Sequence, residues 1–252
     1  MHPPVGENEL DEALERAAHL VRAARQIAVL TGAGISAESG LATFRGNGGL
    51  WEGHRVEEVA TPRAFDADPG LVWRFYNLRR ANLATVSPNP GHYAIAHLEK
   101  RFGEGFTLIT QNVDGLHQLA GSKNVLEIHG ALRRVRCTGC GLIEDRGYQP
   151  LPDLPKCARC SALLRPDVVW FEEMLPDHIW ASAELAVNRC QCLLVVGTSA
   201  VVYPAAGLIE NAMARDAKVI EVNLTPTQAS FSVDIVLNGP SGKLLPELIK
   251  RL

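Results

Sequence analysis

Short apolar runs recur along the chain, and a small or polar residue follows each of them. The first run, residues 27–30, has the length and β-branched content of a buried parallel strand. Further strands are expected at residues 106–110, 125–128, 193–196, 218–222 and 235–237, and an extended segment at 168–171. The residues that follow the strands are Gly32, Gln111, His129, Gly197 and Asn223.

Helical patterns separate these runs. Leu10, Leu14 and Val21 recur at helical spacing and predict an amphipathic helix over residues 8–24. Other helical tracts are expected from residue 62, at 71–80, 93–102, 204–215 and 243–252. Strands that alternate with helices imply a parallel sheet, so the residues that follow the strands should share one edge, where ligands collect. The predicted fold class is α/β, with a Rossmann-like parallel sheet.

A glycine-rich turn follows the first strand. Gly32 and Gly34, with Ala37 in the third place, match the pattern in which backbone N–H groups approach a pyrophosphate and a helix then packs against the strand. The polar, cation-bearing loop that continues through Arg45 suits a dinucleotide. Taken alone, the motif is also compatible with an ordinary turn.

Four of the six cysteines form two C-x-x-C pairs. Cys137 and Cys140 precede Cys157 and Cys160 at the separation typical of tetrahedral zinc. Because all four ligand positions are filled, the zinc is expected to be structural. Two redox or disulfide pairs are the alternative, and they fit a reducing compartment poorly. The remaining two, Cys190 and Cys192, are most simply core residues.

Composition narrows the class of protein. The 252 residues allow one large domain, or a main domain with an insert, and the net charge of −3 gives no basic surplus for nucleic acid. No apolar run reaches the length of a membrane span, and the acidic, polar N-terminus is unlike a signal peptide. We therefore expect a cytoplasmic protein with no nucleic-acid or membrane partner, and a monomer.

Several motifs, in order and spacing, resemble those of the sirtuin family of NAD-dependent protein-lysine deacylases. The resemblance covers residues from about 20 to 250. Besides the four cysteines, it rests on Gly32–Gly40 with Thr43–Gly46, Thr110–His117, Glu127–Gly130, Arg165–Phe171, Gly197–Ser199 and Val222–Asn223. It implies one catalytic domain, residues 1–252. Within it, 1–46, 90–130 and 167–252 would form the Rossmann-like NAD-binding domain, and a smaller inserted domain would consist of a helical module, 47–89, and a zinc ribbon, 131–166.

The resemblance also implies the chemistry and its residues. In the family, the carbonyl oxygen of an acyl-lysine attacks C1′ of the nicotinamide ribose of NAD, and nicotinamide leaves; the products are free lysine and O-acyl-ADP-ribose. His129 matches the general base, a task that suits an imidazole near neutral pH. Asn112 and Asp114 match residues that hold the nicotinamide and its ribose, although both could instead cap the following helix. The other matched cofactor positions are Gly32, Ala33, Gly34, Ser36, Thr43, Phe44, Arg45, Gln111, Gly197, Thr198, Ser199, Asn223, Leu224 and Ser241.

Tyr76 and Arg79 bear on the choice of acyl group. Their Tyr-x-x-Arg pattern resembles that of the sirtuin class that prefers succinyl-, malonyl- or glutaryl-lysine, and helical spacing puts both on one face. Arginine can bind an acyl carboxylate in a bidentate manner while tyrosine donates a further bond. Ala60 fits the roomy pocket of this class. Alternatively, Arg79 and Arg80 could belong to an exposed basic face. We expect desuccinylase and demalonylase activity with weaker deacetylation.

The segment Val168, Val169, Trp170 and Phe171 matches the strand that pairs with the peptide substrate. Glu172 follows it where the family usually has glycine, so peptide binding could be weakened or redirected. Ala42 also replaces the usual proline, which should loosen the cofactor loop.

Three other functions compete with this interpretation. A hydride-transferring dehydrogenase would need an acidic residue that ends a second strand about 20 residues after the glycine turn, and that region here is loop-like. Mono-ADP-ribosyl transfer from NAD is a closer alternative. The third is a non-enzymatic module that binds NAD or acyl-lysine, against which the presence of His129 with Asn112 and Asp114 argues.

Overall fold

A computed structural model describes residues 7–42, 50–51 and 54–252. Its main body is a six-stranded parallel sheet in the order β11-β10-β9-β1-β4-β5. The strands are β1 (Ile27–Thr31), β4 (Phe106–Thr110), β5 (Val125–Glu127), β9 (Cys192–Val196), β10 (Lys218–Asn223) and β11 (Ile235–Asn238). All six expected strands are present, and their carboxyl ends share one edge, as the sequence predicted.

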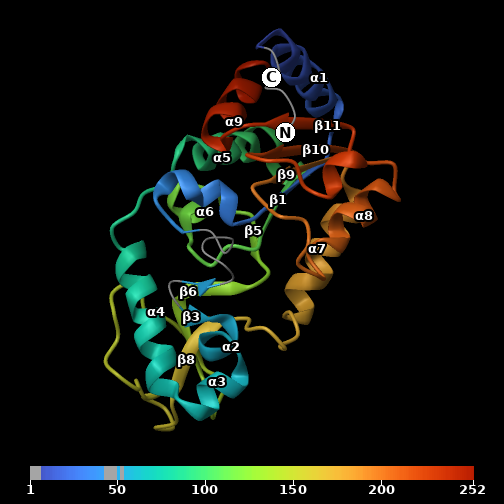
Figure 1. The fold of residues 1–252 in the computed structure, drawn as a ribbon. Coiled ribbons are helices and arrows are strands. Elements are labelled where there is room, and N and C mark those ends of the chain that lie inside the picture. The colour runs from blue at the N-terminus through green and yellow to red at the C-terminus, as the bar shows by residue number, and fades with distance from the viewer. Residues whose placement is uncertain (1–6, 43–49, 52–53) are drawn as a thin grey trace.

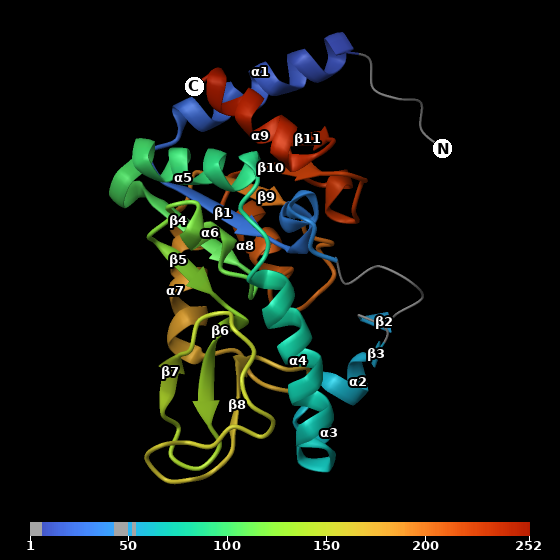
Figure 2. The ribbon, with the colours of Figure 1, turned by 90° about the vertical axis from the view of Figure 1, so that its left-hand side faces the viewer.

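Helices cover both faces of this sheet (Figures 1 and 2). On one face, α1 (Glu7–Ala23), α5 (Pro90–Phe102) and α9 (Ser241–Lys250) contribute to the larger apolar cluster, which contains Val21, Ile95 and Leu245. On the other, α7 (Asp177–Arg189) and α8 (Gly207–Met213) contribute Val187 and Leu208 to a second cluster. The sequence analysis did not name α7. The short elements η1 (Ala33–Ser39), η2 (Gly103–Gly105), α6 (Leu116–Leu119) and η3 (Ala229–Phe231) complete this body.

A smaller body lies beyond the carboxyl edge of the sheet (Figure 2). Its three-stranded antiparallel sheet has the order β7-β6-β8, formed by β6 (Gly130–Cys137), β7 (Ile143–Asp145) and β8 (Leu164–Val168). Three helices pack beside it, α2 (Val56–Val59), α3 (Pro62–Ala67) and α4 (Pro69–Leu83). The antiparallel pair of β2 (Leu50–Trp51) and β3 (His54–Arg55) precedes them. The exact domain bounds given above stay a prediction.

One apolar cluster joins the helices of the smaller body to its sheet. It contains Trp73 and Tyr76 of α4, Leu132 of β6 and Trp170, which follows β8. Asp68 and Thr61 begin α4 and α3 in the usual way, because each side chain accepts a hydrogen bond from the first turn of its helix. Among the described helices, none combines the length and the apolar character needed to cross a bilayer.

Candidate active site

The turns after β1 and β9 touch each other closely. Gly34 N–H donates to Gly197 O at 2.7 Å, and Gly32 N–H donates to Val196 O at 3.0 Å. A Cβ on Gly34 would lie 2.6 Å from the carbonyl oxygen of Gly197, so a larger residue would force the two turns apart. Glycine is therefore needed here for close approach of the backbone, at the place where the strand order reverses and ligands bind.

The segment after Gly34 differs from the expectation in one respect. It is a 3₁₀ helix, η1, in which Ile35 and Ser36 are buried and Ala37 is exposed. The helix expected after the strand is therefore a 3₁₀ helix, and its apolar contact with the core is made by Ile35 and not by Ala37. The reason is geometric, because the 3₁₀ turn brings Ile35 into the apolar cluster and directs Ser36 toward the loop after β4.

Polar side chains of the loop after β4 point toward the turn after β1. Asn112 Nδ2 donates to Gly32 O at 3.1 Å and to Ser36 Oγ at 3.3 Å. The Asp114 carboxylate accepts from Ser36 Oγ at 2.8 Å and from Leu116 N–H at 2.9 Å, and burial raises its pKa. The N-cap of α6 is Gly115, without a side-chain cap, so the alternative holds only in that Asp114 accepts from the first residue of the helix, and Asp114 also faces Ser36 across the site. Ser36, Asn112 and Asp114 form one hydrogen-bonded cluster.

His129 follows β5 on the same edge. Its Nδ1 lies 3.0 Å from the carbonyl oxygen of Gln111. Because a carbonyl can only accept, the neutral ring must carry its proton on Nδ1, which leaves Nε2 as an acceptor. Burial lowers the pKa of His129, so the ring is neutral at physiological pH. The free Nε2 of the neutral ring can therefore accept a proton.

Two further histidines lie beneath the site, and the sequence analysis did not single them out. The rings of His92 and His117 are 4.9 Å apart and both are buried. His117 Nε2 is 3.0 Å from Thr31 Oγ1, and His92 Nε2 is 3.4 Å from Ser36 Oγ. Burial lowers the pKa of His92 to about 4 and that of His117 to about 3. His92 lies near the start of α5 and His117 in α6. Nothing in the sequence around either residue indicates that the two rings meet.

The residues matched to the adenosine half of the cofactor follow β9, end β10 or begin α9, and Gln111, matched to a ribose contact, follows β4. Gln111 Nε2 donates to Thr198 Oγ1 at 2.9 Å, and Asn223 Nδ2 donates to Thr198 O at 2.8 Å. Leu224 is 69% exposed just beyond β10. Ser241, at the start of α9, is buried and donates to Glu38 at 3.3 Å. Ala33 and Ser199 lie in the adjacent turns, whereas Thr43, Phe44 and Arg45 fall outside the described residues.

Tyr76 and Arg79 share a face of α4, as their spacing predicted. The guanidinium carbon of Arg79 lies 5.8 Å from the centre of the Tyr76 ring. The Tyr76 hydroxyl accepts a hydrogen bond from Trp170 Nε1 at 2.9 Å, and burial raises its pKa, so the hydroxyl keeps a proton to donate. Ala60, 2% exposed, belongs to the same cluster.

Arg80 differs from its neighbour. It is 1% exposed and donates to four main-chain carbonyls, among them those of Gly147 at 2.6 Å and Gln149 at 3.1 Å. The alternative that Arg79 and Arg80 form an exposed basic face is therefore wrong for Arg80, whose charge is taken up by backbone dipoles.

The segment matched to the peptide-binding strand leaves β8 and passes the site. Val169 N–H donates to His129 O at 2.9 Å, which places the segment beside the main chain of His129. The side chains of Val168 and Trp170 are buried, and Phe171 is 46% exposed. Glu172 adopts φ +74°, a conformation that favours glycine, and its carboxylate makes a two-bond ion pair with Arg63.

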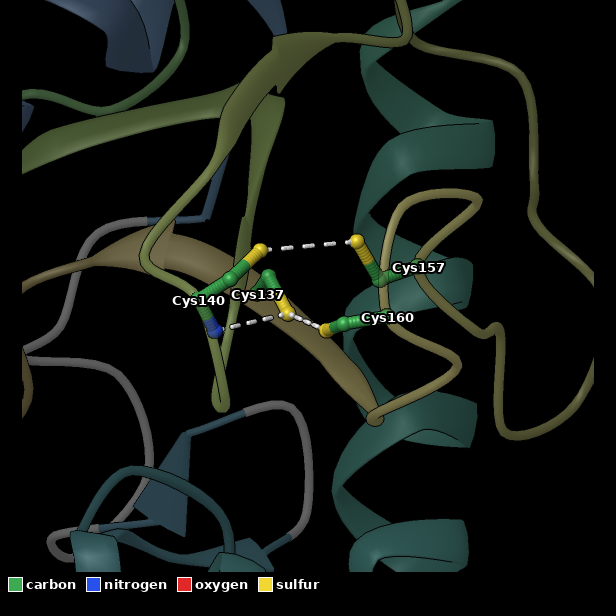
Figure 3. Close-up of side chains that lie close together, drawn as sticks. All are labelled: Cys137, Cys140, Cys157 and Cys160. Atoms are coloured by element: carbon green, nitrogen blue, oxygen red, sulfur yellow. Dashed lines mark hydrogen bonds between the residues drawn. The ribbon is translucent and has the colours of Figure 1, made fainter.

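The four cysteines of the two C-x-x-C pairs converge at the end of the smaller body (Figure 3). All four sulfur atoms lie within 4.8 Å of one another, and those of Cys140 and Cys157 are 3.8 Å apart. Zn–S bonds of about 2.3 Å in a tetrahedron give neighbouring sulfurs about this separation. Backbone N–H groups of Gly139 and Cys140 each donate to Cys137 Sγ at 3.4 Å, and the pKa of that thiol is lowered to about 6. The donor set fits zinc.

Comparison with known proteins yields one family. Residues 32–204 match the profile of the Sir2 family. NAD-dependent protein deacylase 2 of Pyrobaculum aerophilum is 49% identical over 237 residues, which cover 93% of this chain and 94% of the relative. The mitochondrial NAD-dependent protein deacylase sirtuin-5 of Danio rerio is 42% identical over 254 residues, which cover 90% of this chain and 83% of the relative.

Solved structures give the same result. A crystal structure of a Sir2 homologue in complex with NAD superposes with a TM-score of 0.87 at 43% identity, covering 94% of this chain and 92% of that chain. The likeness extends through both the parallel sheet and the cysteine-bearing body, because so little of either chain is left uncovered.

Proposed function

The chain belongs to the Sir2 family and is an NAD-dependent protein deacylase, and we propose that it prefers acyl groups ending in a carboxylate, succinyl and malonyl, over acetyl. One observation carries the preference: a phenol and a guanidinium, those of Tyr76 and Arg79, share one face of α4 beside Trp170. The likeness to sirtuin-5 supports the proposal. The preferred substrates are then proteins or peptides with succinyl- or malonyl-lysine.

The chemistry of the acyl end follows from these two side chains. The guanidinium of Arg79 can donate hydrogen bonds to both oxygens of a terminal carboxylate, and the Tyr76 hydroxyl can donate a third hydrogen bond. An acetyl group has no terminal carboxylate, so it would make no charge-assisted hydrogen bond with Arg79. The preference then comes from charge-assisted hydrogen bonds, each of which contributes about 1.5–3 kcal/mol.

The reacting end uses the residues at the carboxyl edge of the sheet. NAD supplies the ribose carbon to which the acyl oxygen is transferred. We assign His129 Nε2 as the acceptor of the ribose hydroxyl proton, because Nδ1 is held by the Gln111 carbonyl. Asn112 and Asp114, buried beside Ser36, would bind the nicotinamide amide and the ribose hydroxyls.

Zinc completes the proposal in a structural role. Cys137, Cys140, Cys157 and Cys160 would hold it, and all four positions of a tetrahedron would be occupied by sulfur, so the metal would take no part in the reaction. We further propose that the protein works as a cytoplasmic monomer.

Acyl preference is tested with one peptide sequence that carries acetyl-, succinyl- or malonyl-lysine. Nicotinamide release and peptide mass are followed with NAD present, and His129→Tyr sets the background without catalysis. We expect kcat/KM to be highest for the succinyl and malonyl peptides. Arg79→Met should lower it for these two about ten- to hundredfold and leave the acetyl peptide nearly unchanged, because the variant removes a charged hydrogen-bond donor.

Arg74→Met is the matched control, since Arg74 is an exposed arginine of the same helix. Efficient turnover of the acetyl peptide alone would refute the preference. Succinyl turnover that is the same in wild type and Arg79→Met would remove Arg79 from acyl recognition.

A further inference from the structure

The loop that carries Asp114 is joined to the smaller body at two points. Leu132 N–H, from β6, donates to Val113 O at 2.9 Å. The hydroxyl of Tyr148, from the segment after β7, donates to Asp114 O at 2.8 Å. The two bonds hold successive carbonyls of the loop, so the main chain at Asp114 cannot move without breaking a contact with the smaller body.

Gly115 and Tyr148 fit together at the second point. Gly115 adopts φ +72°, and a Cβ at this position would lie 1.9 Å from the Tyr148 hydroxyl oxygen. The missing side chain therefore makes room for the phenol. Burial raises the pKa of Tyr148 to about 12, so its hydroxyl remains a donor at neutral pH.

Arg80 fixes the segment from which Tyr148 projects. Its guanidinium donates to the carbonyls of Gly147 and Gln149, which flank the tyrosine, and also to that of Leu132. One buried cation therefore holds both segments that bind the Asp114 loop. Arg80 belongs to α4, the helix that also carries Tyr76 and Arg79.

The position of the Asp114 carboxylate depends on this main chain. One carboxylate oxygen accepts from Ser36 Oγ at 2.8 Å and the other from Leu116 N–H at 2.9 Å. Both distances require that the loop stay where the Leu132 and Tyr148 bonds hold it. A small shift of the Asp114 carbonyl would move the carboxylate away from Ser36, and therefore away from a ligand bound between β1 and β4.

We propose that Tyr148 is a positioning residue for NAD binding, which it supports by holding the Asp114 main chain from the smaller body, with Arg80 orienting Tyr148. The inference rests on the proposed function in one respect, the assignment of Asp114 to the NAD ribose. It adds a residue from outside the sheet to the cofactor site.

Tyr148→Phe in the full, zinc-loaded chain tests the role. The variant keeps the ring and removes one hydrogen bond, so we expect KM for NAD to rise about three- to tenfold. KM for the acyl peptide, the zinc content and the melting temperature should stay near their wild-type values. Tyr93→Phe is the matched control, because Tyr93 is 53% exposed on α5. An unchanged KM for NAD, or a loss of activity that merely follows loss of zinc, would overturn the proposal.

A double-mutant cycle gives a second test that does not depend on a single variant. Gly115→Ala strains the left-handed backbone in any background, but it meets the Tyr148 hydroxyl only when that hydroxyl is present. We expect Gly115→Ala to raise KM for NAD by a larger factor in wild type than in Tyr148→Phe. Equal factors would contradict the interlocking of the two residues.

Asp114→Asn separates this inference from the assignment on which it rests. If that variant raises KM for NAD and Tyr148→Phe does not, the role of Tyr148 is wrong and the ribose assignment stands. If neither variant changes KM for NAD, Asp114 does not bind the ribose, and both proposals fall.

Discussion

The parallel sheet has an apolar cluster on each face, whereas the sheet of the smaller body has one, shared with three helices. The two regions also treat buried polar groups differently. At the edge of the parallel sheet, side chains such as Asn112 and Asp114 find hydrogen-bond partners within neighbouring loops. In the smaller body, four cysteines converge on a point, and a buried arginine takes up four carbonyls.

The difference indicates where each region obtains its stability. The parallel sheet is long enough to bury two layers of apolar side chains, so its core does not need a metal. The smaller body has a short sheet and long connections, and small units of this kind depend on metals or buried ions. Loss of metal, a change of pH or a substitution should therefore affect the stability of the two regions differently.

Removal of zinc should have the largest effect, confined at first to the smaller body. Cys157→Ser leaves three thiolates, and structural zinc contributes on the order of 10 kcal/mol in small domains. We expect amide hydrogens of β6 and β8 to lose protection from exchange while those of β1, β4 and β9 keep theirs. Hydrogen exchange followed by mass spectrometry, together with metal analysis, measures both regions in one sample.

Cys190→Ala is the control, because this buried cysteine packs in the cluster beneath the parallel sheet. It should keep a full complement of zinc and the exchange pattern of wild type in the smaller body. Equal loss of protection in both sheets of Cys157→Ser would show that the two regions unfold as one unit.

Acid should have the second largest effect, and it should start in the larger region. His92 and His117 are buried with pKa values of about 4 and about 3, against 6.5 in the unfolded chain. Between pH 6.5 and about 4 the unfolded state binds more protons, so the free energy of unfolding falls as pH falls through this range. For His92 alone, a difference of about 2.5 pH units at about 1.4 kcal/mol each is about 3 kcal/mol.

Urea unfolding at a series of pH values measures this slope. Replacement of His117 by Asn should flatten it, since one of the two titrating rings is gone. His19→Asn, on the exposed face of α1, should leave the slope unchanged. If the free energy of unfolding depends on pH equally in wild type, His117→Asn and His19→Asn, the buried histidines do not cause the dependence.

Glu172 should have the smallest effect. Its ion pair with Arg63 is exposed, with 76% and 47% of the two side chains accessible, and such pairs contribute about 0–1 kcal/mol. A left-handed conformation costs a non-glycine residue about 1 kcal/mol. The two contributions nearly cancel in Glu172→Gly, which should change the free energy of unfolding by less than about 1 kcal/mol, as measured by urea unfolding.

Glu172→Ala separates the two contributions, because it loses the ion pair and keeps the unfavourable backbone. It should be the less stable of the two variants, by about 1 kcal/mol. If Glu172→Ala and Glu172→Gly have the same free energy of unfolding, the left-handed backbone of residue 172 costs less than about 1 kcal/mol.

The parallel sheet could be predicted from sequence because each strand is a short apolar run that ends in a glycine or a polar residue. The convergence of Cys137, Cys140, Cys157 and Cys160 could be predicted from their spacing. Helix α7 was missed although Ile179, Ala183 and Val187 repeat every four residues and face the core, or pack against it. Each of these patterns lies within one short segment of the chain, so it can be recognised from the sequence alone.

Contacts between distant segments could not be predicted. Tyr148 reaches the carbonyl of Asp114 across 34 positions, and nothing near either residue indicates the bond. Arg79 and Arg80 look alike in sequence, yet only the fold decides that one is buried among carbonyls. The glycine motif predicted a helix after β1, but it did not indicate that this helix is a 3₁₀ helix in which Ile35 is buried.

With Tyr76 and Arg79 in the acyl-recognition role proposed above, the burial of Arg80 restricts how the choice of acyl group can change during evolution. A rotation or a one-residue slip of α4 would withdraw the guanidinium from the carbonyls of Leu132, Gly147 and Gln149. The hydrogen bonds of Arg80 therefore fix the rotation of α4 about its axis, so the side chains at positions 76 and 79 keep their direction. New acyl specificities should arise in descendants of this chain by exchange of those two side chains on an unmoved backbone.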